Sequence, residues 1–113
     1  MQLPETGLLL RIFIGESDKH AGRPLYEVIV EEARRRGLAG ATVIRGVMGF
    51  GANSRIHTSK ILRLSEDLPM LIEIVDEAGK IEAFLPGLDT MIQEGLVTLE
   101  RVHIVIYRDN GRE

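Results

Sequence analysis

The order in which hydrophobic periodicities follow one another restricts the fold of this chain more than any other feature. Four stretches alternate apolar and polar positions or are rich in β-branched residues, as strands are, and two space their apolar residues three or four apart, as helices do. Strands are expected at 7–15, 41–48, 60–64 continued by 69–76, and 97–107, and helices at 24–36 and 77–94. The order β-α-β-β-α-β predicts an α+β domain, the ferredoxin-like split βαβ sandwich, in which an antiparallel four-stranded sheet carries two helices on one face.

Glycine and proline residues set the expected ends of the two helices. Pro24 suits a first helical turn, where its missing N–H costs nothing, and Gly37 suits the position just after the last turn. Pro86-Gly87 predicts a kink or a break in the second helix, and Gly95 predicts its end. The expected buried stripes comprise Leu25, Val28, Ile29 and Ala33 in the first helix, and Ile81, Leu85, Leu88 and Ile92 in the second.

The sheet face turned away from the helices is expected to be apolar as well. It would carry residues such as Leu9, Phe13 and Leu71. A small domain that exposes such a face is stabilised when further copies cover it, and closed symmetry is the usual arrangement. We therefore expect a homo-oligomer.

Length and composition favour one domain without disulfides or a membrane segment. The 113 residues are expected to form a single domain over 1–108, followed by a flexible tail at 109–113. The chain contains no Cys, which excludes a disulfide framework, a thiolate zinc site and a Cys nucleophile. No run approaches the roughly 20 apolar residues of a membrane span, and no signal peptide is evident. We therefore expect a cytoplasmic protein that is not inserted in a membrane.

A basic, glycine-rich stretch follows the second expected strand. Residues 33–65 contain seven Arg or Lys and no Asp or Glu, although the whole chain has a net charge of −3. Three of these cations, at 34–36, lie in the last turn of the first helix, where the helix dipole favours them. The loop at 49–60 is suited to binding an anion, because glycines let backbone N–H groups approach a ligand closely.

Two sets of candidate residues come from this stretch. Arg45 can contact a phosphate through two N–H groups or form a salt bridge at a subunit interface, and the sequence leaves both open. Basic and polar side chains of the loop can bind an acidic partner or simply face solvent. The candidate nucleotide-binding residues are Arg45, Gly46, Gly49, Phe50 and Gly51, and the candidate partner contacts are Asn53, Arg55, His57 and Lys60.

The part of the chain after this loop has the opposite charge. Residues 64–100 contain nine Asp or Glu and one basic residue, Lys80. A solvated acidic helix face is the simpler explanation. The alternative is an acidic surface that meets the basic loop of a neighbouring subunit.

The remaining polar side chains predict neither a metal site nor a catalytic one. Glu16, Asp18 and His20 alternate in a polar loop and could hold a divalent metal, but a polar turn that caps the next helix explains them more simply. His103 is expected to be packed or at an interface rather than a ligand. No serine-hydrolase, Walker-loop, zinc-protease or dinucleotide-binding signature is present, and no carboxylate pair stands out. We therefore expect no enzyme.

Several phrases of the sequence together resemble one family. They occur at 10–16 (LRIFIGE), 22–26 (GRPLY), 40–46 (GATVIRG), 49–51 (GFG), 55–57 (RIH) and 64–69 (LSEDLP). Over nearly its full length the chain resembles the PII-like family known as domain of unknown function family 190, whose fold is similar to that of the nitrogen-regulatory PII proteins. PII proteins are trimers that bind adenine nucleotides in clefts between subunits. In them a long loop after the second strand senses the ligand and contacts the partner.

The resemblance implies a trimeric signalling protein with an adenine nucleotide at the subunit clefts, beside 49–51. The loop 49–60 would contact a regulated partner, such as a membrane transporter or channel. The shorter loop and the acidic stretch after Leu64 depart from the PII pattern, which makes AMP or ADP as good a candidate as ATP.

Two other functions belong to proteins of similar topology. A divalent-metal-binding trimer of the cation-tolerance type is the alternative to nucleotide binding. RNA binding ranks last, because the chain is acidic overall and lacks the aromatic-rich phrase of RNA-recognition modules. We therefore expect no nucleic-acid partner.

Overall fold

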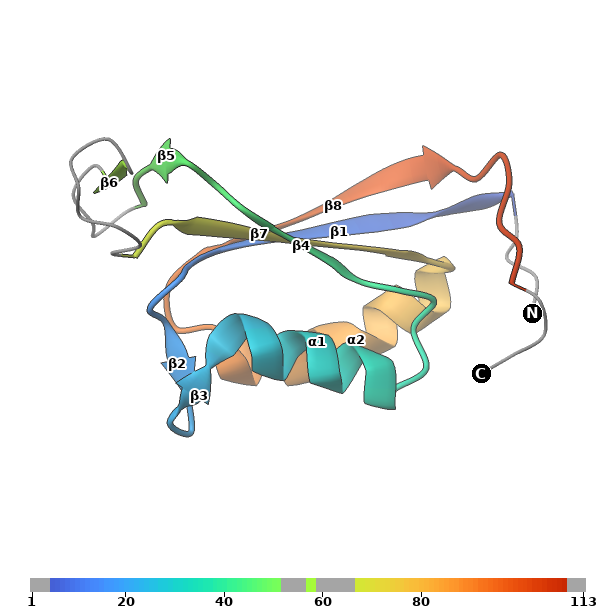
Figure 1. Cartoon of the computed structure of the whole chain (residues 1–113). Coiled ribbons are helices and arrows are strands. Elements are labelled where there is room, and N and C mark those ends of the chain that lie inside the picture. Colours follow the sequence, from blue (N-terminus) through green and yellow to red (C-terminus); the bar gives the residue numbers. More distant parts are fainter. Residues whose placement is uncertain (1–4, 52–56, 59–66, 110–113) are drawn as a thin grey trace.

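A computed structural model describes residues 5–51, 57–58 and 67–109. Its elements are β1 (Thr6–Gly15), β2 (Lys19–His20), β3 (Arg23–Pro24), α1 (Leu25–Arg35), β4 (Thr42–Arg45), β5 (Met48–Gly49), β6 (His57–Thr58), β7 (Pro69–Asp76), α2 (Ala78–Met91) and β8 (Leu96–His103). Both helices lie on one face of the main sheet, as Figure 1 shows. The domain therefore has two layers.

Four strands form the main sheet in the spatial order β4-β7-β1-β8. All three neighbouring pairs are antiparallel, and β1 and β7 are the central strands. This arrangement confirms the predicted ferredoxin-like fold. Two short ribbons, β2 with β3 and β5 with β6, stand apart from the main sheet (Figure 1).

The hydrophobic core lies between the sheet and the helices. Buried and part-exposed residues alternate along the whole of β7, as expected for a strand with one covered face. The core comprises Leu10, Ile12 and Ile14 of β1, Met70, Ile72 and Ile74 of β7, Leu25, Ile29 and Ala33 of α1, and Ile81, Phe84, Leu88 and Met91 of α2. The predicted stripe of α1 is thus confirmed for three of its four residues, and Val28 is only partly buried against the same core.

Helix α1 ends in the glycine-dependent turn that its sequence predicts. Gly37 has a φ of 79°, in the left-handed region where a side chain would be strained. Its N–H donates to the carbonyl of Arg34 at 3.0 Å, and the N–H of Leu38 donates to that of Ala33 at 3.1 Å. These two bonds form a Schellman motif.

Both outer strands are shorter than predicted because their partners end. The predicted strand 41–48 is divided after Arg45: the Gly46 N–H donates to the Pro69 carbonyl at 2.7 Å, but Pro69 has no N–H to donate in return. The last strand ends at His103 rather than at 107, because His103 pairs with Thr6, the first residue of β1. The predicted extended stretch 60–64 lies outside the described residues.

Helix α2 also differs from its prediction. It ends at Met91, well before Gly95, because Ile92 takes an extended conformation, and it is continuous through Pro86. The buried line contains Phe84 and Met91, whereas the predicted Leu85 and Ile92 are only partly buried. The sequence did not show which of these neighbouring apolar residues would face the core most directly, because a core-facing stripe on a helix is about 100° wide.

A row of apolar side chains crosses the sheet face that points away from the helices. Ile44 of β4 lies opposite Leu71 of β7, Leu71 lies opposite Phe13 of β1, and Phe13 lies opposite Leu96 of β8. We call these four residues the apolar row. Ile44, Phe13 and Leu96 are exposed. The predicted apolar surface is therefore confirmed at this end of the sheet.

The middle of the same face is polar. The Nε of Arg11 on β1 donates to Glu73 Oε2 on β7 at 2.9 Å, and its Nη1 donates to Glu100 Oε1 on β8 at 3.1 Å. These hydrogen bonds raise the pKa of Arg11, so the guanidinium stays charged. The ion pairs link the two central strands and one edge strand.

One carboxylate, that of Asp76, is completely buried in the domain. Its Oδ1 accepts the N–H of Glu77 at 2.7 Å, and its Oδ2 accepts the N–H of Ala39 at 2.9 Å. Asp76 thereby joins the end of β7, the start of α2 and the segment between α1 and β4. A carboxylate just before a helix N-terminus is also favoured by the helix dipole.

Candidate functional site

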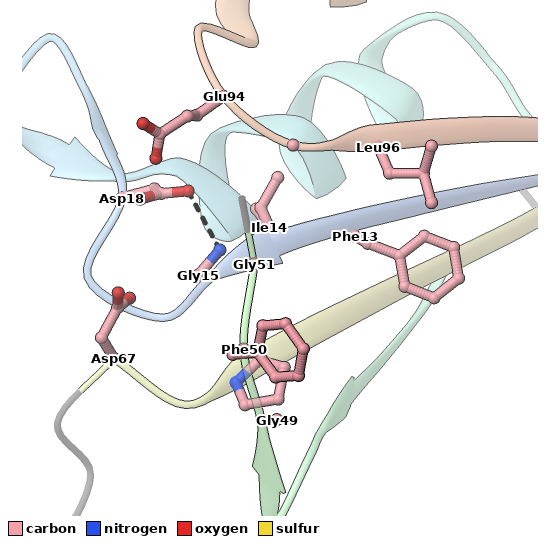
Figure 2. Close-up of a pocket in the computed structure, with 12 residues that line it drawn as sticks. Phe13, Ile14, Gly15, Asp18, Gly49, Phe50, Gly51, Asp67, Glu94 and Leu96 are labelled. Atoms are coloured by element: carbon pink, nitrogen blue, oxygen red, sulfur yellow. Dashed lines mark hydrogen bonds between the residues drawn. The ribbon is translucent and has the colours of Figure 1, made fainter. Parts of the chain in front are cut away.

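An open cleft of about 640 Å³ lies where β1 ends and β8 begins. Figure 2 shows its residues, which come from four parts of the chain. They are Phe13, Ile14, Gly15 and Asp18; Gly49, Phe50 and Gly51; Asp67 and Pro69; and Glu94, Gly95 and Leu96. The apolar row ends in this cleft, because Phe13 and Leu96 belong to both.

The cleft has an apolar side and an acidic side. The rings of Phe13 and Phe50 lie with Leu96 on one side, and the carboxylates of Asp18, Asp67 and Glu94 lie on the other (Figure 2). Phe50 is 72% exposed, which leaves its ring available to a ligand.

Glycines bring β5 close to the start of β7. A Cβ at Gly46 would lie 2.8 Å from Pro69 Cγ, and a Cβ at Gly49 would lie 2.9 Å from the same atom. Any side chain at either position would therefore force the two segments apart. These glycines have a structural reason to be present, independent of any ligand.

The acidic side is built on the loop that follows β1. Asp18 Oδ2 accepts the N–H of Gly15 at 3.0 Å, and Asp67 Oδ1 accepts the N–H of Ser17 at 3.0 Å. Asp67 itself has a φ of 48°, a conformation that Asp tolerates better than most residues. Backbone hydrogen bonds therefore fix two of the three carboxylates in place.

The pKa of Asp18 is raised from its ordinary value. Partial burial is the main cause, and the negative charges of Asp67 and Glu94 contribute, against the opposing effect of the hydrogen bond from Gly15. Asp67 and Glu94 are thus each close enough to Asp18 to disfavour its charged form.

We expect Asp18→Asn to change how stability depends on pH. An acid with a raised pKa in the folded state binds its proton more readily when folded, so it favours folding as the pH falls through the raised pKa. The unfolding free energy of wild type minus that of Asp18→Asn should therefore increase from about pH 7 to about pH 4. Urea unfolding at a series of pH values measures this difference, and Asp89→Asn on the exposed side of α2 is the control. A pH-independent difference would contradict the expectation.

Arg45 forms an ion pair with the loop after β1 instead of lining the cleft. Its Nε lies 3.1 Å from Glu16 Oε2, with 46% of the Arg45 side chain and 23% of the Glu16 side chain exposed. The other oxygen, Glu16 Oε1, is buried and has no hydrogen-bond partner within the described part of the chain. The sequence left a phosphate contact and an intersubunit salt bridge open for Arg45, and the structure contains a salt bridge within one chain.

The structure brings together three of the five predicted nucleotide-binding residues, Gly49, Phe50 and Gly51. Arg45 and Gly46 do not line the cleft, and Gly46 lies against Pro69. Among the predicted partner contacts, Asn53, Arg55 and Lys60 lie outside the described residues. The backbone of His57 pairs with that of Gly49, so a short ladder begins the loop.

Several residues of the cleft were not singled out by the sequence. The sequence pattern placed Phe13 on the outer face of the first strand, but this position indicated a subunit interface and not a ligand site. Asp18 was considered as a metal ligand or as part of a polar turn that caps the next helix, and not as a residue of this cleft. The segment Glu94–Leu96 carries no motif and reaches the cleft only through the fold.

The His, Asp and Glu side chains of the described residues do not form a metal site. Within residues 5–51, 57–58 and 67–109, no group of three or more His, Asp or Glu side chains has the arrangement of a metal site. His20 lies in the β2–β3 hairpin, next to a turn formed by Ala21 and Gly22 with φ values of 53° and 81°. Over the same described residues, neither helix is long and apolar enough to cross a membrane.

Comparison with known proteins decides the family. The model of domain of unknown function family 190, described as an uncharacterized ACR family, matches residues 7–104. The chain belongs to this family. A UPF0166 protein of Aquifex aeolicus is 41% identical over 97 residues, which cover 86% of this chain and 91% of the relative. A UPF0166 protein of Methanocaldococcus jannaschii is 36% identical over 97 residues, covering 85% and 89%.

Solved structures with similar folds include PII-like proteins. CPII of Thiomonas intermedia, bound to ADP and bicarbonate, superposes on this family 190 member with a TM-score of 0.66 at 17% identity, covering 88% of each chain. A putative PII-like signaling protein of Thermus thermophilus gives a TM-score of 0.65 at 20% identity, covering 88% of this chain and 90% of that one. CPII is also known with ADP, AMP and bicarbonate bound. At such identities the likeness establishes the PII-like fold, as the sequence resemblance predicted.

Proposed function

We propose that this protein is a trimeric regulator of the PII-like kind that binds an adenine nucleotide in clefts between subunits. The main support is the cleft, which is lined by the predicted anion-binding residues 49–51. In addition, CPII, a protein of similar fold, is known with ADP or AMP bound. AMP and ADP are candidates as good as ATP. The protein acts without catalysis, in the cytoplasm.

The chemistry of the cleft suits a nucleoside. A purine base stacks favourably on an exposed aromatic ring, and Phe50 and Phe13 offer such rings. Carboxylates accept hydrogen bonds from ribose hydroxyl groups. Glycines at 49 and 51 have no side chain to keep a phosphate away from the backbone of this segment.

The apolar row supports assembly at the same place. Three of its four residues are exposed in a single chain, and it ends in the cleft through Phe13 and Leu96. A neighbouring copy that covers the row would therefore also border the cleft. Three copies related by a closed rotation would cover every row and form equivalent clefts.

Regulation would act through the loop 49–60, which starts in the cleft at Gly49. A nucleotide that binds one arrangement of this loop more tightly than another shifts the population toward it. The partner, a transporter or channel in this proposal, would then contact Asn53, Arg55, His57 and Lys60.

Calorimetric titration with AMP, ADP and ATP tests the nucleotide site. We expect saturable binding with one nucleotide per chain, and Phe50→Ala should weaken it about tenfold, the usual effect of losing one base-stacking ring. Val47→Ala is the matched control, because Val47 is also exposed beside the cleft but does not line it. Absence of binding of all three nucleotides at millimolar concentration would refute the proposal.

A further inference from the structure

The main sheet has two edge strands, β4 and β8, each paired on one side only within the described part of the chain. Backbone N–H and C=O groups along such an edge can bind another strand, and proteins usually protect them with charged residues, prolines or a covering segment. In β8 every residue except Val102 is exposed, and the first half, residues 96–99, contains no charged residue and no proline. This edge is therefore open to pairing.

The first half of β8 is also apolar on both faces of the sheet. Leu96 lies on the face away from the helices, opposite Phe13. Val97 and Leu99 lie opposite core residues of β1, hence on the face toward the helices, and both remain exposed. A partner that covered one face alone would leave the other apolar side chains in water. A strand that continued the sheet would cover side chains on both faces.

The opposite edge of the same sheet has the direction that such a partner needs. Three antiparallel pairings separate β4 from β8, so these two strands run in opposite directions. Rotation about an axis along the strands keeps their directions, and it brings β4 of one copy antiparallel beside β8 of the next. Head-to-tail contacts of this kind close into a ring when the rotation is a simple fraction of a turn.

The residues of the two edges also match. The apolar row ends at Leu96 on β8 and at Ile44 on β4, so opposing Leu96 to Ile44 of the next copy joins the rows end to end. In this register the following pairs are alike in kind: Val97 with Val43, Thr98 with Thr42, and Leu99 with Ala41. Pairs of β-branched residues and of threonines are favourable across strands. A shift of two residues, the smallest that preserves the faces, would oppose Thr98 to Ile44 or Gly40 instead.

We propose that β8 of each copy pairs with β4 of the next copy in this register, so that three sheets form one continuous antiparallel ring. The inference rests on the trimer of the proposed function and adds which segments meet. The same register places Arg45 of the next copy opposite Gly95, which lines the cleft. The backbone of the neighbouring copy thus completes the border of the cleft.

Disulfide trapping tests the register, because the chain contains no Cys of its own. In a double variant that combines Thr98→Cys with Thr42→Cys, oxidation should link each copy to the next, and a non-reducing denaturing gel should show mainly two-chain and three-chain species. Opposed Cα atoms of antiparallel strands lie ~4.5–5.5 Å apart, within the ~4.4–6.8 Å range of a disulfide. Within one chain the two positions are separated by three strand spacings, about 14 Å, which excludes a bond inside the chain.

A second matched pair and two controls make the result specific. Val97→Cys with Val43→Cys is oxidised in parallel, because neighbouring pairs alternate between the closer and the wider spacing. Glu100→Cys with Thr42→Cys places the thiols diagonally, with Cβ atoms ~7–8 Å apart, and should link at least about tenfold more slowly. Thr98→Cys alone should remain a single chain on the gel, and its cross-linking would mean that two β8 strands meet.

The outcomes separate this inference from the proposed function. Light scattering and circular dichroism first establish the mass and the folding of each variant. If the proteins are folded trimers and neither matched pair links, or the diagonal pair links as fast, the edge pairing is refuted and the trimer stands. If the wild-type protein has the mass of one chain, the proposed trimer fails and the edge pairing fails with it.

Discussion

Replacing Asp76 by alanine is expected to lower the free energy of unfolding by about 3 kcal/mol. The carboxylate is fully buried and accepts the N–H groups of Glu77 and Ala39. Hydrogen bonds to a charged group contribute about 1.5–3 kcal/mol each, and a buried donor left unpaired costs about 1–3 kcal/mol. Because these bonds join α2 to the segment before β4, one substitution loosens both sides of the fold. Urea unfolding followed by circular dichroism measures the loss.

Two further variants identify the origin of this effect. Asp76→Asn keeps the volume and one acceptor but directs its NH₂ group at a backbone N–H, so we expect a smaller loss than for alanine. Asp89→Asn makes the same chemical change on the exposed side of α2 and should change stability by less than about 0.5 kcal/mol. A loss below about 1 kcal/mol for Asp76→Ala would mean that water replaces the carboxylate without cost.

Ile44→Glu is expected to dissociate the proposed trimer into folded single chains. Ile44 is 47% exposed in one chain, so a carboxylate there remains hydrated and the domain stays folded. In an assembly that covers the apolar row, the same carboxylate would be buried without a cation, which costs several kcal/mol. We expect subunit affinity to fall by at least about a hundredfold, since each factor of ten corresponds to about 1.4 kcal/mol. Light scattering at a series of concentrations gives the mass.

The choice of Ile44 keeps this test separate from ligand binding. Ile44 belongs to the apolar row but does not line the cleft, unlike Phe13 and Leu96. Ala83→Glu adds the same charge on the exposed side of α2 and should leave the mass at three chains. A wild-type mass of one chain, or an unchanged mass of three for Ile44→Glu, would count against assembly through this face.

Much of the fold was predictable from the sequence because buried apolar residues recur with the period of the strand or helix that carries them. The apolar residues of 69–76, with Pro69 at the start of the stretch, predicted the bounds of β7 correctly, because proline is tolerated at the first residue of a strand. The position of Gly37 after α1 was predictable for a local reason, the left-handed conformation that glycine adopts readily.

Features that depend on pairing between distant segments were not predictable. Strand β4 ends at Arg45 because Pro69, 24 residues later, lies opposite Gly46. The apolar row needs the register of four strands, and a shift of one residue would have moved its members to different faces. The ion pair between Arg45 and Glu16 likewise joins two segments whose proximity only the fold determines.

The candidate site was predictable on one wall only. Glycine-rich composition identified 49–51, but Glu94–Leu96 has no local pattern that indicates a ligand. These segments meet because β1 lies beside β8 in the sheet and β5 follows the edge strand β4. Sequence reasoning treated Asp67 and Glu94 as part of a solvated surface or a subunit contact, and Asp18 as a metal ligand or a turn residue. It thereby missed that all three line one cleft.

The proline that ends the β4 ladder also has a mechanical consequence. At Pro69, strand β7 can bind the chain that continues from β4 only by accepting the Gly46 N–H at its carbonyl, because the proline nitrogen carries no hydrogen to donate. The β5–β6 hairpin follows immediately, at Met48, and carries Gly49 at its start. Gly46 and Val47 therefore join the β4 ladder to the hairpin in a bend that belongs to neither strand. The direction in which the residues that border the cleft leave the main sheet is thus set at this bend and not by the pairing of the central strands.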